Sequence, residues 1–227
     1  MNLKEHPTVQ SYLNSKKRLR NADSPLKSNE LKAIAKEYGA DAAGLVDVHR
    51  ETMKPYRKNI EWALPEAKTV LILAWGLNQV QMQSPAHSLA DVEFNQGWAN
   101  ANKCARAIAE KVRQFGVKAL HMPAGFPFET ERWPNSIWLT SDKIFAVEGG
   151  LGHMGINRLV LHPEKGAAMI LGSVLIDQEC DAYDKPMQPP VKRSSGINLV
   201  RTLFFLHEKN GENEFLQHTI RHRSRYQ

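Results

Sequence analysis

The chain has 227 residues, which is enough for one substantial domain or for a domain with an appendage, because single domains commonly contain about 100 to 200 residues. Its composition is that of a soluble globular protein, with 42% apolar and 24% charged residues. No apolar run approaches the roughly 20 residues that span a bilayer, and the opening residues do not resemble a signal peptide. The sequence therefore predicts a cytoplasmic protein and argues against a membrane partner.

The net charge of +6 is unevenly distributed. Residues 191–227 carry seven Lys or Arg against three Glu, a surplus of four, so only +2 belongs to the first 190 residues. A second basic cluster lies at residues 16–20. Both are interpreted as solvated segments, and a nucleic-acid partner is the weaker alternative.

The two cysteines, Cys104 and Cys180, are too far apart in sequence to form a disulfide framework or a metal knuckle, and they are predicted to be buried thiols. No histidine pair has the spacing of a zinc site on a helix. No metal site is predicted from the residues themselves.

The first half of the chain begins with a leading arm, residues 1–27, which has no sustained periodicity. A helix is predicted next, with Ser28 as its cap and apolar residues at helical spacing as far as Tyr38. Strands are predicted at 42–48 and 69–75, with a short helix around 60–62 between them. The second strand is uncharged and rich in β-branched residues, which predicts a central place in a sheet.

The second half is predicted to hold a polar loop, an amphipathic helix, a short strand, an aromatic loop and a last strand, at 78–96, 98–115, 117–121, 122–138 and 167–176. The aromatic loop is either a lid or wall of a ligand site or a cover over the core edge. The last strand is apolar enough to be buried on both faces. Alternating strands and helices predict an α+β fold, α/β-like, with one main sheet flanked by helices.

The segment 147–158 is the centre of the prediction, because four glycines fall within seven of its positions. Glycine allows positive φ or close approach to a flat ligand where a Cβ would collide. Gly150, Gly152 and Gly155 also match the dinucleotide fingerprint G-x-G-x-x-G, which requires a helix after the loop. Pro163 leaves no room for that helix, so a dinucleotide site is disfavoured.

The run from Ala146 to Asn157, its continuation through 161–166 and the strand 171–177 resemble the core signature of corrinoid-dependent iron-sulfur reductases. That family includes the epoxyqueuosine reductases and the reductive dehalogenases. The similarity extends upstream through residues 67–75 and covers about residues 28–190.

The resemblance implies a nitroreductase-like core that binds cobalamin, followed by a ferredoxin-like module whose 4Fe-4S clusters feed electrons to the cobalt. It divides the chain into an arm at 1–27, a corrinoid-binding core at 28–190 and a basic tail at 191–227. The family's glycine motif lies against the corrinoid, and the matching positions here are Gly150, Leu151, Gly152, His153, Met154, Gly155 and Asn157.

The chain departs from the family pattern in two places. Residues 187–196 contain no cysteine where the family has a C-x-x-C-x-x-C run, so the four thiolates of a 4Fe-4S cluster are absent. The family's proton-donating aspartate maps onto Ser136, which is no comparable acid. Asp142 and Glu131 are the nearest carboxylates, and Asp142 is taken as the candidate catalytic residue. A solvated or capping carboxylate is its alternative role.

The leading hypothesis is the core of a cobalamin-dependent reductase that lacks its iron-sulfur module and is inactive without an external electron donor. Its substrate would be a small molecule or a modified nucleoside. A corrinoid-binding or trafficking module without catalysis is one alternative. A flavin-binding relative of the same fold is the other.

Overall fold

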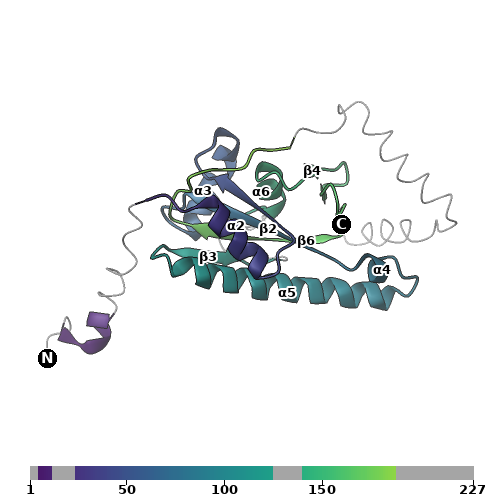
Figure 1. Ribbon diagram of the computed structural model, residues 1–227, viewed down its shortest axis with the longest axis horizontal. Coiled ribbons are helices and arrows are strands. Elements are labelled where there is room, and N and C mark those ends of the chain that lie inside the picture. The colour runs from purple at the N-terminus through teal and green to yellow at the C-terminus, as the bar shows by residue number, and fades with distance from the viewer. Residues whose placement is uncertain (1–4, 12–23, 125–139, 188–227) are drawn as a thin grey trace, which may run out of the picture. The chain divides into compact units, whose positions relative to one another are not determined.

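The computed structural model describes residues 5–11, 24–124 and 140–187, and Figure 1 shows their arrangement. The main sheet has four strands in the order β1-β2-β6-β3, and every neighbouring pair is antiparallel. The fold is therefore α+β with one main sheet, as predicted. The strands of this sheet are β1 (Ala42–Asp47), β2 (Thr69–Gly76), β3 (Ala119–Met122) and β6 (Met169–Ile176).

The two central strands, β2 and β6, are the two apolar runs that the sequence singled out. They pair over their whole length, from Thr69 opposite Ile176 to Gly76 opposite Met169. Both are buried at nearly every position, because a strand in the middle of a sheet with helices on both faces exposes neither face to water. The prediction that the second apolar run is buried on both faces is confirmed.

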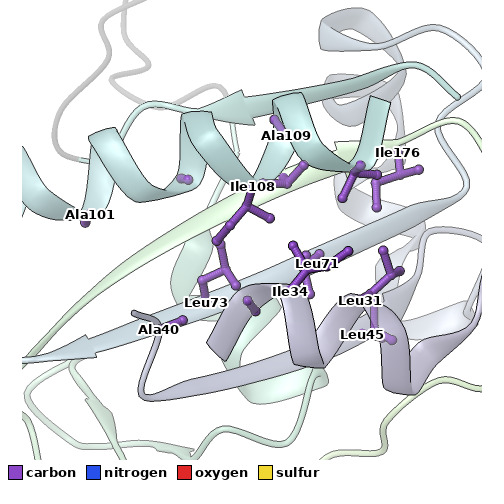
Figure 2. Close-up of a cluster of buried hydrophobic side chains, with 14 of the residues drawn as sticks. Leu31, Ile34, Ala40, Leu45, Leu71, Leu73, Ala101, Ile108, Ala109 and Ile176 are labelled. Atoms are coloured by element: carbon purple, nitrogen blue, oxygen red, sulfur yellow. The ribbon is translucent and has the colours of Figure 1, made fainter. Parts of the chain in front are cut away.

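Helices α2 and α5 cover one face of the sheet. Figure 2 shows apolar side chains of both helices, among them Ile34 and Ile108, converging on Leu71 and Leu73 of β2. Because alternate residues of a strand point to opposite faces, Ile72 faces the other side. The helices are α2 (Ser28–Glu37), α3 (Lys54–Ala63), α4 (Gln79–Met82), α5 (His87–Arg113) and α6 (Asp142–Glu148), with a 3-10 turn, η2, at Glu51–Met53.

The opposite face is covered by α3, α6 and the chain that follows α6. Ile60 of α3 and Phe145 of α6 are fully buried there, together with Ile72 of β2 and Leu175 of β6. This second core is the base on which the glycine segment lies. The sheet thus separates a large structural core under α2 and α5 from the face that carries the predicted site.

Two local predictions were wrong. The polar loop predicted at 78–96 contains α4 and the first turns of α5, which begins at His87 and not near residue 98. Those turns present Leu89 and Val92 to solvent instead of an apolar stripe to the core, so the periodicity that marks a buried helix face is absent. Ser28 does not cap α2, because it is the first helical residue and its own N–H donates to Asp181 Oδ1 at 2.9 Å.

The segment that follows β6 returns to the outer edge of β1. Leu26 forms a bridge with Cys180, and the main-chain N–H of Asp184 donates to the carbonyl of Leu45 at 2.9 Å. The Asp184 carboxylate accepts the N–H of Leu45 at 2.8 Å and the ammonium of Lys32 at 2.7 Å. This segment satisfies backbone groups at an edge strand that would otherwise lack partners.

The predicted domain boundaries stay predictions, because most of the leading arm and all of the basic tail at 191–227 lie outside the described residues. The thiol of Cys180 is buried and that of Cys104 is partly buried, and both are free. In the described part of the chain, no helix combines the length and apolar character needed to cross a bilayer.

Candidate functional site

Helix α6 leads directly into the glycine segment, which then forms a short hairpin. β4 (His153–Met154) pairs antiparallel with β5 (Val160–Leu161). A helix therefore precedes the glycines and a hairpin follows them, which is the reverse of the strand-loop-helix order that a dinucleotide fingerprint requires. The prediction against a dinucleotide site agrees with this order. Sequence reasoning assigned no helix to residues 142–148.

The first half of the glycine segment is interior. Leu151 belongs to the core beneath α6, and Gly152 is buried. A Cβ on Gly152 would collide with the carbonyl oxygen of Leu161 on the facing strand. Gly150 has φ +71°, and a Cβ there would lie 2.7 Å from the carbonyl oxygen of Lys185. These two glycines are required by close approach of the chain's own backbone. The sequence analysis had instead assigned their role to a ligand.

The second half of the segment is exposed and apolar. The exposed fractions of the Met154, Ile156 and Leu159 side chains are 40%, 72% and 41%. Single exposed apolar side chains are common, but three within residues 154–159 form a concentrated apolar surface of the kind that contacts a ligand or a partner. We call residues 153–159 the hairpin tip.

The polar residues of the hairpin tip have defined places. Asn157 Oδ1 accepts the N–H of Leu159 at 3.2 Å, and the N–H of Gly155 donates to the Leu159 carbonyl at 2.7 Å. The side-chain oxygen of Asn157 thus shapes the turn, while the NH2 group of the same side chain can still donate a hydrogen bond. His153 is partly exposed on β4, opposite Leu161. Four of the seven predicted cofactor-binding positions, His153, Met154, Gly155 and Asn157, lie in the hairpin tip, whereas Leu151 and Gly152 are buried and Gly150 packs against the Lys185 carbonyl.

Asp142, the candidate acid, is the first residue of α6. Its carboxylate does not cap the helix, and Oδ1 accepts a hydrogen bond of 2.6 Å from the hydroxyl of Ser173 on β6. Burial raises the pKa of Asp142 to about 6, because a low-dielectric surrounding disfavours the charged form, and the Ser173 bond opposes part of that rise. Asp142 is half-buried, and its carboxylate is bonded to Ser173 instead of capping the helix.

Asp142 and the glycine segment lie at opposite ends of α6, about 10 Å apart along the helix axis at 1.5 Å per residue. Both ends of this helix are fixed. The acid end is held against β6 through Ser173. The glycine end is held by a residue that the sequence analysis missed, Arg50.

Arg50 joins three segments of the chain. Its guanidinium donates to the main-chain oxygen of Glu148 at 2.8 Å, to Glu148 Oε2 at 3.2 Å and to the main-chain oxygen of Asp184. Thr52 also donates to Glu148 Oε2, at 2.7 Å. No motif marks Arg50 in the sequence, since its partners lie 98 and 134 residues away.

Other predicted features lie outside this geometry. Ser136, Glu131 and the aromatic loop, apart from residues 122–124, are outside the described residues. Within the described ranges no group of three or more metal-ligating side chains converges.

No protein-family model matches the chain. Among curated proteins, an epoxyqueuosine reductase of Prochlorococcus marinus (strain NATL2A) is 31% identical over 195 residues, covering 71% of this chain and 57% of the relative. The chain thus spans little more than half the length of that relative.

Solved structures with the same fold come from two groups of reductases. The reductive dehalogenase NpRdhA has a TM-score of 0.55 and 16% identity, over 82% of this chain and 26% of the dehalogenase. One structure of this enzyme type concerns B12-dependent dehalogenation. An epoxyqueuosine reductase bound to a modified tRNA stem loop has a TM-score of 0.50 and 14% identity, over 74% of this chain and 49% of that enzyme. At these identities the structures establish the fold alone.

Proposed function

Since this chain belongs to the family of corrinoid-dependent reductases that includes epoxyqueuosine reductase and the reductive dehalogenases, we propose that it is the cobalamin-binding core of such a reductase. The observation that carries the proposal is the exposed apolar hairpin tip at the end of the segment whose sequence resembles the family signature. The activity itself, the substrate and the partners are parts of the proposal.

The residues of the hairpin tip fit a corrinoid. A corrin is broad and flat, with an apolar face and amide groups around its rim, and such ligands are held by apolar side chains with a few polar groups. Met154, Ile156 and Leu159 offer apolar surface. The Asn157 amide is a donor suited to the rim. Gly152 allows the two strands of the hairpin to lie close together, because a Cβ there would collide with the Leu161 carbonyl oxygen, and this close pairing supports the tip.

Cobalamin in its low-valent state would supply the electrons for reductive removal of an oxygen or a halogen from the substrate. The chain itself would supply the proton. With a pKa of about 6, Asp142 carries a proton in a substantial fraction of molecules just below neutral pH, as a general acid requires. Its carboxyl can pass that proton to a substrate and take another from water.

Under this proposal the electrons would come from outside these 227 residues. A 4Fe-4S cluster needs four cysteine ligands, and the 227 residues contain two cysteines. Cys180 is also unsuited to metal ligation, because burial raises the pKa of its thiol to about 11. An external reductant or an iron-sulfur partner protein would fill this role.

The substrate would be a small molecule or a modified nucleoside. The modified nucleoside is suggested by the epoxyqueuosine reductase structure, which holds an epoxyqueuosine-modified tRNA stem loop. A corrinoid-binding or trafficking module is the second candidate function. Such a module needs the hairpin tip but has no use for a buried acid.

Turnover with an externally reduced corrinoid separates the two candidates. The purified full chain is loaded with cobalamin, reduced chemically and offered a halogenated phenol or an epoxyqueuosine-containing stem loop. We expect product from the wild type and at least a tenfold slower reaction from Asp142→Asn, since general acids contribute roughly 100-fold or more. Uptake of cobalamin with no turnover of either substrate would support the trafficking module. Uptake of a flavin in place of cobalamin would support the flavin-binding alternative.

A further inference from the structure

Among the residues that the structure describes, Ser173 is one of two fully buried polar residues, the other being Thr69. It lies near the middle of β6, opposite Ile72 of β2 and Met122 of β3. A hydroxyl at such a place is unfavourable unless it forms a hydrogen bond. Its bond goes to Asp142 Oδ1, at 2.6 Å.

The surroundings of this pair are otherwise apolar. On the same face of the central strands lie Ile72, Ala74 and Leu175. Lys143, which follows Asp142 on α6, is exposed. His121 of β3 pairs with Val174 and therefore lies on the other face of the sheet. At the far end of α6, Glu148 is paired with Arg50.

Asp142 consequently has one described hydrogen-bonding side-chain partner and no described cation against it. Asp142 is half-buried. A partly desolvated acid without a neighbouring cation is unfavourable for stability, and such groups are concentrated at functional sites. The rigid strand gives Ser173 one fixed position, because β6 is paired on both sides.

We propose that Ser173 is a positioning residue for the acid Asp142: its hydroxyl donates to Oδ1 and so leaves Oδ2 as the oxygen that carries the transferable proton. This inference rests on the proposed function and deepens it, because it assigns a second residue to the proton step. The proton leaves Oδ2, joins the substrate atom being reduced, and is replaced from solvent. A reduced corrinoid would supply the electrons.

The test is a carboxyl carbon NMR titration of the full chain labelled at aspartate, with Asp142→Asn used to identify the Asp142 resonance. In the wild type we expect a midpoint near pH 6. Ser173→Ala removes the donor that stabilises the ionised form, so the midpoint should move to higher pH by on the order of one unit. Ser173→Thr keeps the hydroxyl and should restore the midpoint.

Thr69→Val is the matched control, because it removes the other fully buried hydroxyl of the sheet. It should leave the Asp142 midpoint unchanged while showing how much stability such a loss costs. Should Ser173→Ala fail to fold, Ser173→Cys keeps the volume and weakens the donor, and a smaller shift in the same direction is expected. A midpoint that stays in place in every Ser173 variant would overturn the proposal.

The catalytic part of the inference has its own readout. The pH–rate profile is measured with externally reduced cobalamin. Its alkaline limb should shift to higher pH in Ser173→Ala, together with the NMR midpoint, and should return to the wild-type position in Ser173→Thr. A profile that does not follow the midpoint contradicts the role of Ser173 in the proton step. Absence of cobalamin uptake contradicts the proposed function itself. The NMR titration contains no cobalamin, so the two failures are distinguishable.

Discussion

Arg50 and Glu148 form a two-point contact, in which one guanidinium nitrogen donates to the main-chain oxygen of Glu148 at 2.8 Å and to its carboxylate at 3.2 Å. Both side chains are largely buried, with exposed fractions of 20% and 13%. The guanidinium also donates to the main-chain oxygen of Asp184. The contact fixes the end of α6, where the glycine segment begins, against the segment that follows β6.

Arg50→Lys should therefore lower the free energy of unfolding by about 2 kcal/mol, because an ammonium cannot reproduce the planar fork and leaves partly buried acceptors without donors. Arg113→Lys is the control, since Arg113 pairs with Glu110 on an exposed helix surface at 3.4 Å and should change stability by under about 0.5 kcal/mol. Urea unfolding followed by circular dichroism measures both. Equal effects of the two substitutions would show that Arg50 does not hold α6.

Asp142 should make the stability of the protein depend on pH. Its pKa is about 6 in the folded chain, against 3.8 for an unperturbed aspartate. Between these values the folded state binds more protons than the unfolded state, so stability falls as pH rises from about 4 to 6 and stays low above 6. The loss amounts to up to about 3 kcal/mol, at 1.36 kcal/mol per unit.

Asp142→Asn removes this titration. We expect the variant to lack the decline between pH 4 and 6 and to be at least as stable as the wild type at pH 7.5, because no charge is then buried. Denaturant midpoints collected across that pH range provide the measurement. A decline of the same size in the variant would mean that another group causes it.

Gly152→Ala tests why glycine occupies the interior half of the segment. An added Cβ would collide with the Leu161 carbonyl oxygen, so we expect a loss of at least about 2 kcal/mol even without any ligand. Gly166→Ala is the control, because the Cβ there meets open space and only the strain of φ +60° remains, about 1 kcal/mol. If Gly152→Ala folds with normal stability yet loses cobalamin, the glycine contacts the ligand as the sequence analysis first suggested.

The sheet was predictable because its central strands are encoded locally. β2 and β6 are apolar and rich in β-branched residues, and burial on both faces leaves that pattern uninterrupted. The start of α5 was not predictable, since Leu89 and Val92 on its exposed turns give no buried stripe. Helix α6 was missed because seven residues are too few to show helical periodicity clearly.

The site was predictable as a segment but not as a geometry. The four glycines marked residues 147–158 as a candidate site. The pairing of His153 with Leu161 decides which glycines face the protein and which border the exposed tip, and the sequence does not show that pairing. Asp142 was named only as the nearest carboxylate. Its contact with Ser173 spans 31 residues and depends on which face of β6 the hydroxyl occupies. Such tertiary contacts leave no local signature.

The central claim, that the hairpin tip binds a corrinoid, is tested most directly by titrating the full chain with cobalamin and following the absorbance change that accompanies loss of the lower base. Wild-type protein and Val80→Lys should bind at micromolar concentration or below, because Val80 is 79% exposed and lies on α4, outside the hairpin tip. Ile156→Lys, at a residue 72% exposed on the tip, should raise Kd at least tenfold, since it places a charge where apolar surface meets the ring. No uptake by the wild type, or equal Kd values for the two lysine variants, would contradict the claim.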